Sequence, residues 1–174
     1  MDQTVTLQEL RSPAPAAEAL LARHHADMRA QSPEESCHVM TSDALRASGE
    51  RVFALWAGGA PCAVGALKPL DRAGWPDGVD WPDGGTVMEL KSMHVARARR
   101  GEGLGRVLLD GLADQARASG AVGLCLETGS EPDFAAARAL YHRAGFTDCP
   151  PFGDYVTDPL SVFMLRETAC VVRS

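Results

Sequence analysis

Apolar residues recur along this chain at the spacings of helices and of strands. In residues 14–30, apolar side chains stand three or four positions apart, which places them on one face of a helix. Residues 51–57 and 62–67 are short, mostly apolar runs, which are typical of strands. By these criteria the predicted helices are 14–30, 42–47, 103–119 and 133–144. The predicted strands are 5–7, 51–57, 62–67, 86–95, 122–127 and 161–167.

Glycine, proline and tryptophan mark the connections between these elements. Gly58-Gly59 separates two predicted strands and predicts a two-residue hairpin turn. Residues 68–85, with prolines at 69, 76 and 82, have the composition of a surface loop. Its two tryptophans are expected to pin the loop onto the core, and a lid over an acceptor site is the less favoured alternative. The pattern therefore predicts an α/β (α+β) fold with a mixed sheet flanked by helices.

Length and composition indicate a single domain spanning residues 1–174. With 45% hydrophobic and 23% charged residues, the chain can bury one core and is too short for two typical domains. The first residues lack the basic and apolar regions of an export signal, and no apolar run is long enough to cross a membrane. We therefore expect neither export nor a membrane span.

The five cysteines are an odd number without Cys-x-x-Cys spacing, which argues against a disulfide framework and a structural zinc site. Reduced thiols of this kind predict a cytoplasmic protein. The histidines show no metal-ligand spacing, so we predict no metal cofactor.

Charge is unevenly distributed along the chain. The formal net charge of −6 disfavours nucleic acid as a partner, because binding its phosphates needs a basic surface. Residues 91–106 nevertheless carry five basic side chains against one carboxylate, Glu102. The basic residues are Lys91, Arg97, Arg99, Arg100 and Arg106. A solvated charge run and a site for a polyanionic cofactor explain this equally well, and the glycines nearby favour the cofactor.

Those glycines lie where a predicted strand turns into a predicted helix. Gly101, Gly103 and Gly105 let the backbone approach an anion, and the first turn of the helix offers N–H groups and the positive end of its dipole. A P-loop would need Gly-Lys-Ser or Gly-Lys-Thr, and the dinucleotide fingerprint G-x-G-x-x-G is also not matched. The pattern Arg100-x-x-Gly103-x-Gly105 instead resembles the acyl-CoA pyrophosphate loop of the GNAT superfamily of N-acetyltransferases.

Two further features carry the resemblance, which covers residues 86–148. Glu89 stands six residues before Val95 in the strand that leads to the loop, as a carboxylate does in this family. Residues 140–146 repeat the family's Leu-Tyr pair and Gly-Phe helix exit. The resemblance implies a GNAT-like, mostly antiparallel sheet that splays open at the acyl-CoA site. It also implies transfer of an acetyl group from acetyl-CoA, as co-substrate, to a primary amine by direct attack in a ternary complex.

The resemblance assigns residues to the cofactor. The backbone N–H of Val95 would polarise the thioester carbonyl, and the strand end would pair with the pantetheine arm. Many family members carry asparagine where this chain has Phe134, and Thr128 or Glu127 is the candidate replacement. The cofactor-binding residues are expected to be Met93, His94, Val95, Arg100, Gly101, Gly103, Leu104, Gly105, Arg106 and Thr128.

Glu89 and Tyr141 are the candidate catalytic residues. An amine must lose a proton before it attacks, and Glu89 is the candidate base. Strand alternation predicts that Glu89, Lys91, Met93 and Val95 share one face, so a structural Glu89–Lys91 pair is the alternative. Tyr141 stands where the family places the tyrosine that protonates the departing thiolate, and the alternative is a tyrosine with only a packing role.

The acceptor is the least defined part of the site. Two segments resemble a poorly characterised bacterial GNAT subgroup and would border the acceptor cleft, which gives as candidate contacts Glu35, Ser36, His38 and Tyr155. A small-molecule amine is the expected acceptor, and a protein or peptide amine is the alternative. A non-catalytic acyl-CoA sensor or scaffold is the other class of function, which the presence of both candidate catalytic residues disfavours. Members of the family often form homodimers, and no interface is identifiable in the sequence.

Overall fold

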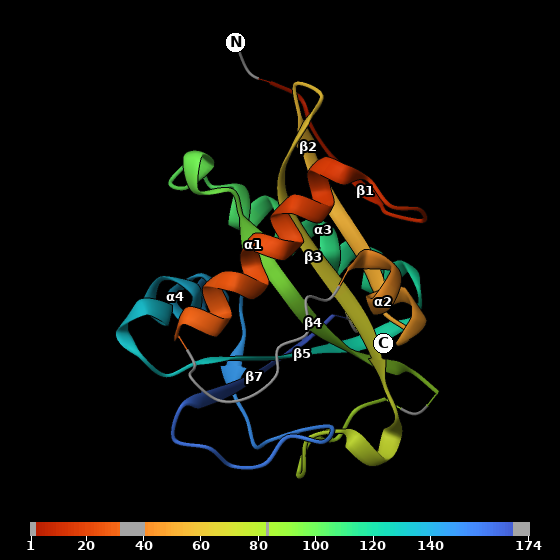
Figure 1. Ribbon diagram of the computed structural model, residues 1–174. Coiled ribbons are helices and arrows are strands. Elements are labelled where there is room, and N and C mark those ends of the chain that lie inside the picture. The colour runs from red at the N-terminus through yellow and green to blue at the C-terminus, as the bar shows by residue number, and fades with distance from the viewer. Residues whose placement is uncertain (1–2, 32–40, 83, 169–174) are drawn as a thin grey trace. The chain divides into compact units, whose positions relative to one another are not determined.

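The computed structural model describes residues 3–31, 41–82 and 84–168 (Figure 1). Its α-helices are α1 (Pro15–Gln31), α2 (Ser42–Ala47), α3 (Leu104–Ala118) and α4 (Ala135–Arg143). Its strands are β1 (Val5–Glu9), β2 (Arg51–Ala57), β3 (Ala60–Leu70), β4 (Thr86–Val95), β5 (Ala121–Gly129), β6 (Thr147–Asp148) and β7 (Ser161–Glu167). Short 3-10 turns are η1 (Arg72–Gly74), η2 (Arg97–Arg99) and η3 (Pro132–Phe134).

The strands are hydrogen-bonded in the order β1-β2-β3-β4-β5-β7-β6. β4 and β5 run parallel, whereas β1 with β2, β2 with β3, β5 with β7 and β6 with β7 run antiparallel. The predicted mixed, mostly antiparallel sheet with helices is therefore confirmed. β6 was not predicted, because two residues are too few to show a periodicity. The predicted helix at 133–144 begins as the 3-10 turn η3 and becomes α4 at Ala135.

The chain divides into two compact units, each described here by itself. The first unit contains Met1–Leu67 and Lys91–Leu112, and the second contains Lys68–Leu90 and Ala113–Ser174. In the part of the chain that the structure describes, no helix is both long and apolar enough to cross a membrane. The prediction of one domain over residues 1–174 stays a prediction.

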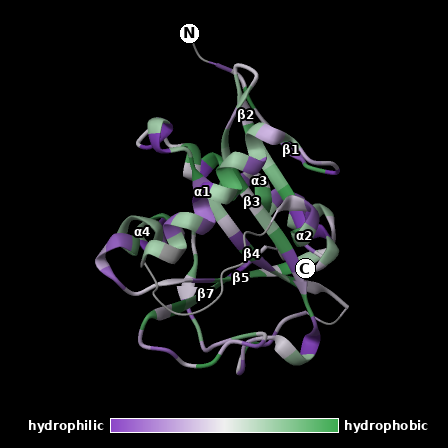
Figure 2. Cartoon of the chain, viewed as in Figure 1, coloured by the Kyte–Doolittle hydropathy of each residue, from purple (hydrophilic) through white to green (hydrophobic). Residues whose placement is uncertain are grey.

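In the first unit, strands are covered on both faces. On one face Ala17 and Leu21 of α1 pack in a core with Val64, Ala66 and other strand residues. Trp56 is partly buried against the same core. On the other face, a Cβ at Gly65 would lie 2.8 Å from a methyl of Leu112 in α3, so a larger residue there would require the Leu112 side chain to move. Coverage of both faces explains why β2 is buried almost throughout, and β2 and β3 are largely hydrophobic in Figure 2.

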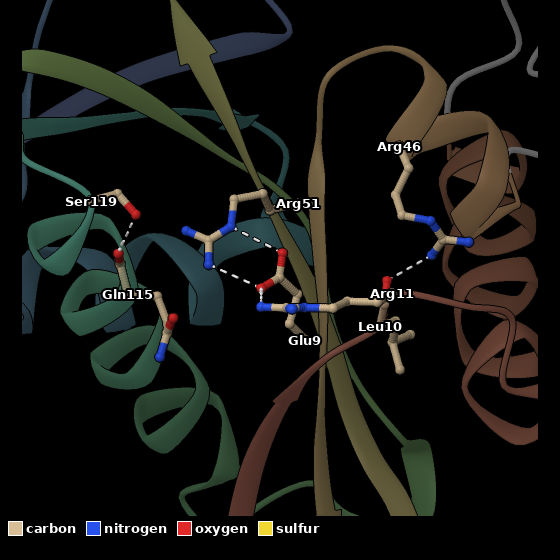
Figure 3. Close-up of polar contacts among 7 residues, drawn as sticks. All are labelled: Glu9, Leu10, Arg11, Arg46, Arg51, Gln115 and Ser119. Carbon is tan, nitrogen blue, oxygen red and sulfur yellow. Dashed lines mark hydrogen bonds and ion pairs between the residues drawn. The ribbon is translucent and has the colours of Figure 1, made fainter.

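A glycine hairpin joins β2 to β3 in this unit, and an arginine side chain links β2 to β1. Gly58 and Gly59 have φ values of 59° and 79°, so the predicted two-residue turn is confirmed with both residues in the left-handed region. Arg51 donates to both oxygens of Glu9 at 3.1 Å across β1 and β2 (Figure 3). The pKa of the Glu9 carboxyl lies below its usual value, mainly because Arg51 hydrogen-bonds the charged form.

The second unit is organised around tryptophan and phenylalanine side chains. Trp81 is 5% exposed and shares a core with Val87, Phe152 and Phe163. A Cβ at Gly123 would lie 0.9 Å from a ring carbon of Trp81, so the indole lies directly on the backbone of β5. The expectation that tryptophan pins the 68–85 connection onto the core is therefore confirmed. Trp75 completes the contact, with its ring centroid 6.1 Å from that of Trp81.

Candidate active site

The loop between β4 and α3 lies in the first unit and is held at its start by the strand next to it. The backbone N–H of Ala96 donates to Cys62 O in β3 at 2.9 Å, and η2 follows at once. Gly101 and Gly103 then have φ values of 84° and 77°, a conformation that side-chain-bearing residues rarely adopt. No atom lies within 4 Å of where a Cβ would stand at either glycine. The glycines therefore serve the turn and leave open space beside it.

The turn presents a row of N–H groups at the start of α3. Gly103 O accepts from the N–H of Arg106 and of Val107 at 3.1 and 3.3 Å, which closes the first turn of the helix. The N–H groups of Gly103, Leu104 and Gly105 come before these first helical hydrogen bonds, and the first N–H groups of a helix have no carbonyl of their own helix to donate to. Leu104, 5% exposed, anchors the first turn in the core. N–H groups left over at a helix start, together with the helix dipole, form a site for phosphate oxygens.

The basic residues around this loop are more neutralised than their sequence suggests. Four of the five lie within 4.0 Å of a carboxylate, two of which come from distant segments. The pairs are Lys91 with Glu50, Arg97 with Asp27, Arg99 with Glu102 and Arg106 with Asp110. Arg100 instead donates through Nε to the carbonyl of Val95 at 3.2 Å, which ties the loop to the end of β4. Backbone N–H groups, rather than a large excess of cations, are therefore the main feature for binding an anion here.

The end of β4 departs from regular strand geometry. Ser92 has a φ of 55° and is the only described residue other than glycine with a positive φ. A left-handed residue inside a strand interrupts its alternation of faces, as in a β-bulge. The prediction that Glu89, Lys91, Met93 and Val95 share one face therefore does not hold across Ser92.

His94 turns its ring toward α1. Its side chain is 6% exposed, and its ring centroid lies 5.6 Å from that of His24, which in turn lies 5.3 Å from His25. Burial lowers the pKa of His94, with a smaller contribution from the charge of Arg100. Burial also lowers the pKa of His24 to about 4, assisted by the neighbouring imidazoles. His24 is therefore neutral at physiological pH, and the lowered pKa of His94 favours its neutral form.

Glu89 lies in the second unit, buried where β4 pairs with β5. Its side chain is 4% exposed, and its Cα is paired with that of Cys125. The Tyr155 hydroxyl donates to Glu89 Oε1 at 2.6 Å. A buried carboxylate needs such charge-assisted hydrogen bonds to offset the loss of water. Tyr155, predicted as an acceptor contact, is thus brought to the candidate base.

Tyr141 lies on α4, in the same unit. Its side chain is 9% exposed, and its ring packs edge-on against Phe146 with centroids 5.9 Å apart. Burial raises the pKa of Tyr141 to about 12, and the carboxylate of Glu127 contributes a smaller effect. The hydroxyl therefore retains its proton at neutral pH, which a proton donor must do. The buried, packed ring is also what we expect if Tyr141 has only a packing role.

The end of β5 contains the residues considered as replacements for the family's asparagine. Thr128 is 8% exposed, and Glu127 accepts from the Ser161 hydroxyl at 2.8 Å. The Phe134 ring lies over Gly129, where a Cβ would come within 2.2 Å of a ring carbon. Phe134 therefore has a packing role at the start of α4.

Three candidate acceptor contacts, Glu35, Ser36 and His38, lie outside the described residues. In the second unit, residues of β6, β7 and the segment that connects them line a pocket of about 280 Å³; they include Asp148, Thr157 and Phe163. Among the described residues no three His, Cys, Asp or Glu side chains are grouped as metal ligands.

The sequence motifs pointed to Glu89, Tyr141 and the loop as candidate site residues. They did not indicate the hydrogen bond between Tyr155 and Glu89 or the ring contact between His24 and His94. Both join residues far apart in the chain with no motif to connect them.

The chain is similar to known proteins over most of its length. Residues 15–146 match the model of the acetyltransferase (GNAT) family. The uncharacterised N-acetyltransferase YsnE of Bacillus subtilis is 35% identical over 150 residues, which are 86% of this chain and 90% of that protein. An IAA acetyltransferase of Azospirillum brasilense is 36% identical over 133 residues, 76% of this chain and 77% of that protein.

Solved structures share the fold. A GNAT-family acetyltransferase of Staphylococcus aureus superposes with a TM-score of 0.64 at 16% identity, covering 95% of this chain and 100% of that one. A Bacillus subtilis acetyltransferase in complex with CoA superposes with a TM-score of 0.63 at 15% identity, covering 94% of this chain and 99% of that one.

Proposed function

Because the chain belongs to the GNAT family of N-acetyltransferases, which are acyltransferases that use acetyl-CoA, we propose that it acetylates a primary amine by direct attack in a ternary complex. The amine nitrogen attacks the thioester carbonyl carbon, the new C–N bond forms, and the C–S bond breaks. Glu89 takes the proton that the amine loses. Tyr141 gives a proton to the thiolate that departs.

The observation that carries this proposal is the row of N–H groups at residues 101–105. These groups belong to a glycine turn that opens directly into α3, and the first N–H groups of a helix have no carbonyl of their own helix to donate to. A pyrophosphate supplies acceptors of the kind that such a helix start favours. Residues 93–95, which lie just before this turn, are proposed to pair with the pantetheine arm through their backbone.

The catalytic assignments rest on the chemistry of the two side chains. Glu89 is a buried carboxylate with a hydrogen-bonded oxygen, which suits a base that must keep one position. Tyr141 is a buried phenol whose raised pKa keeps it protonated, which suits a donor to a thiolate. A small-molecule amine is the proposed acceptor, and residues 1–174 are proposed to form one N-acetyltransferase domain.

The experiment that tests the proposal is isothermal titration calorimetry with acetyl-CoA on the wild-type protein and on two glycine variants. Gly103→Glu places a carboxylate where the pyrophosphate is proposed to lie. Gly49→Glu is the matched control, because Gly49 also has a positive φ of 85° and no atom within 4 Å of a Cβ. Both variants therefore carry similar backbone strain and the same added charge.

We expect wild type and Gly49→Glu to bind acetyl-CoA and Gly103→Glu to lose binding while remaining folded by circular dichroism. Equal binding by all three proteins would contradict the assignment of this loop. A screen of primary amines, in which release of the CoA thiol is measured, then identifies the acceptor. Glu89→Gln is expected to lower kcat by about 100-fold or more in that assay, because general-base catalysis typically contributes about 10²- to 10⁴-fold.

A further inference from the structure

We propose that Tyr155 is a positioning residue, whose hydroxyl holds the Glu89 carboxylate in the orientation that the reaction needs. This inference rests on the proposed function, in which Glu89 is the base. It replaces the expectation that Tyr155 contacts the acceptor. Three features of the second unit support it: the hydrogen bond, the packing of the tyrosine ring, and the anchoring of its backbone.

The hydrogen bond joins a residue near the surface to a buried one. Tyr155 is 36% exposed, whereas Glu89 is 4% exposed, and their contacting oxygens are 2.6 Å apart. A carboxylate only accepts, so the phenol is the donor, and the short distance is typical of a charge-assisted bond. Fixing Oε1 in this way restricts rotation of the carboxylate about its terminal bond. The second oxygen then also has a defined position.

Two phenylalanines fix the ring that carries this hydroxyl. The Tyr155 ring centroid lies 5.2 Å from that of Phe152 and 5.5 Å from that of Phe163. Phe152 and Phe163 are themselves buried and pack edge-on against each other at 5.8 Å. Such aromatic contacts favour particular ring orientations. The hydroxyl is therefore placed by the core of the unit rather than by the surface segment alone.

The backbone around Tyr155 is held at several points although residues 153–160 are all exposed. Gly153 N donates to Gly74 O at 2.6 Å, and Cys149 N donates to Phe163 O at 2.9 Å. At the far end, Ser130 N donates to Leu160 O at 3.0 Å. A surface segment that is hydrogen-bonded just before it begins, at its first residue and at its last is suited to holding a side chain in place. An acceptor contact alone would not require Tyr155 to reach a buried carboxylate.

The hydrogen bond can be tested without knowing the acceptor. The chain has two tyrosines, so protein labelled with ¹³C at tyrosine Cζ gives two signals, which Tyr155→Phe assigns. We expect Glu89→Gln to shift the Tyr155 signal, because a neutral amide oxygen is a weaker acceptor than a carboxylate. Val156→Ala is the control for disturbance of the segment, since Val156 is 75% exposed, and it is expected to leave both signals in place. An unshifted Tyr155 signal in Glu89→Gln would overturn the proposal.

Kinetics with an amine from the acceptor screen test the role itself. Tyr155→Phe keeps the ring and is expected to lower kcat about tenfold, with little change in either KM, because it loosens a reacting group and not a binding contact. An increase in the acceptor KM at unchanged kcat would instead identify Tyr155 as an acceptor contact and overturn the proposal. Glu89→Gln distinguishes failure of the proposed role of Glu89 as the base from failure of the proposed positioning role of Tyr155. Full activity of Glu89→Gln refutes Glu89 as the base, whereas an inactive Glu89→Gln beside a fully active Tyr155→Phe refutes only the positioning role.

Discussion

Acidification should destabilise this protein through His24, in the first unit. The pKa of His24 falls from 6.5 to about 4 in the folded state, mainly through burial and secondarily through the charges of His25 and His94, with Asp27 opposing. The unfolded chain therefore binds more protons than the folded protein between these two values. Stability from the neutral ring is fully present above pH 6.5 and is lost as the pH falls toward 4.

The size of this effect follows from the two pKa values. Linkage from 6.5 unfolded to about 4 folded gives a loss of about 2 kcal/mol in the free energy of unfolding between about pH 7.5 and about pH 5. The lowered pKa of His94 acts in the same direction. A loss of this size is a large fraction of the stability of an ordinary domain.

Urea denaturation followed by circular dichroism at several pH values between these limits measures the effect. His24→Phe keeps an aromatic ring against His25 and His94 but cannot be protonated, so its stability should vary less with pH than that of wild type. His142→Phe makes the same chemical change at a side chain that is 53% exposed, and it should retain the wild-type profile. A wild-type loss on acidification that is the same in His24→Phe would refute this reasoning.

Two further substitutions test the packing of Trp81 in the second unit and the capping of α2 in the first. Gly123→Ala places a methyl where the Trp81 ring lies, 0.9 Å from a ring carbon, and should destabilise by about 3 kcal/mol or more in a denaturation experiment, whereas a change below about 1 kcal/mol would contradict the packing. Thr41→Ala removes the side-chain oxygen that accepts from Ala44 N at 3.2 Å at the start of α2, and should cost about 1 kcal/mol in the same experiment, while Thr41→Ser should retain most of the stability.

The elements could be predicted from the sequence because local rules govern them. β2, β4 and β7 have the bounds that the apolar runs predict, and the left-handed Gly58-Gly59 turn follows from glycine's freedom at positive φ. The sequence did not indicate the interruption at Ser92. A left-handed conformation at serine is set by the surroundings of the strand and has no marker in residue type.

Some parts of the candidate site could likewise be predicted from the sequence, and others could not. The loop, Glu89 and Tyr141 lie in continuous motifs, and so the sequence pointed to them. The contact of Lys91 with Glu50 at 3.9 Å did not follow from spacing, because Glu50 comes from a distant segment. The Tyr155–Glu89 bond joins residues 66 positions apart, and nothing in either local sequence encodes that pairing.

The distribution of tryptophan gives each unit its own optical reporter. All three tryptophans of the chain lie in described segments, with Trp56 in the first unit and Trp75 and Trp81 in the second. Fluorescence from a Trp56→Phe variant would therefore report unfolding of the second unit alone, and a variant that retains only Trp56 would report the first. If the two emission curves coincide along a denaturant series, the units melt as one cooperative body. Separate curves would identify which unit opens first.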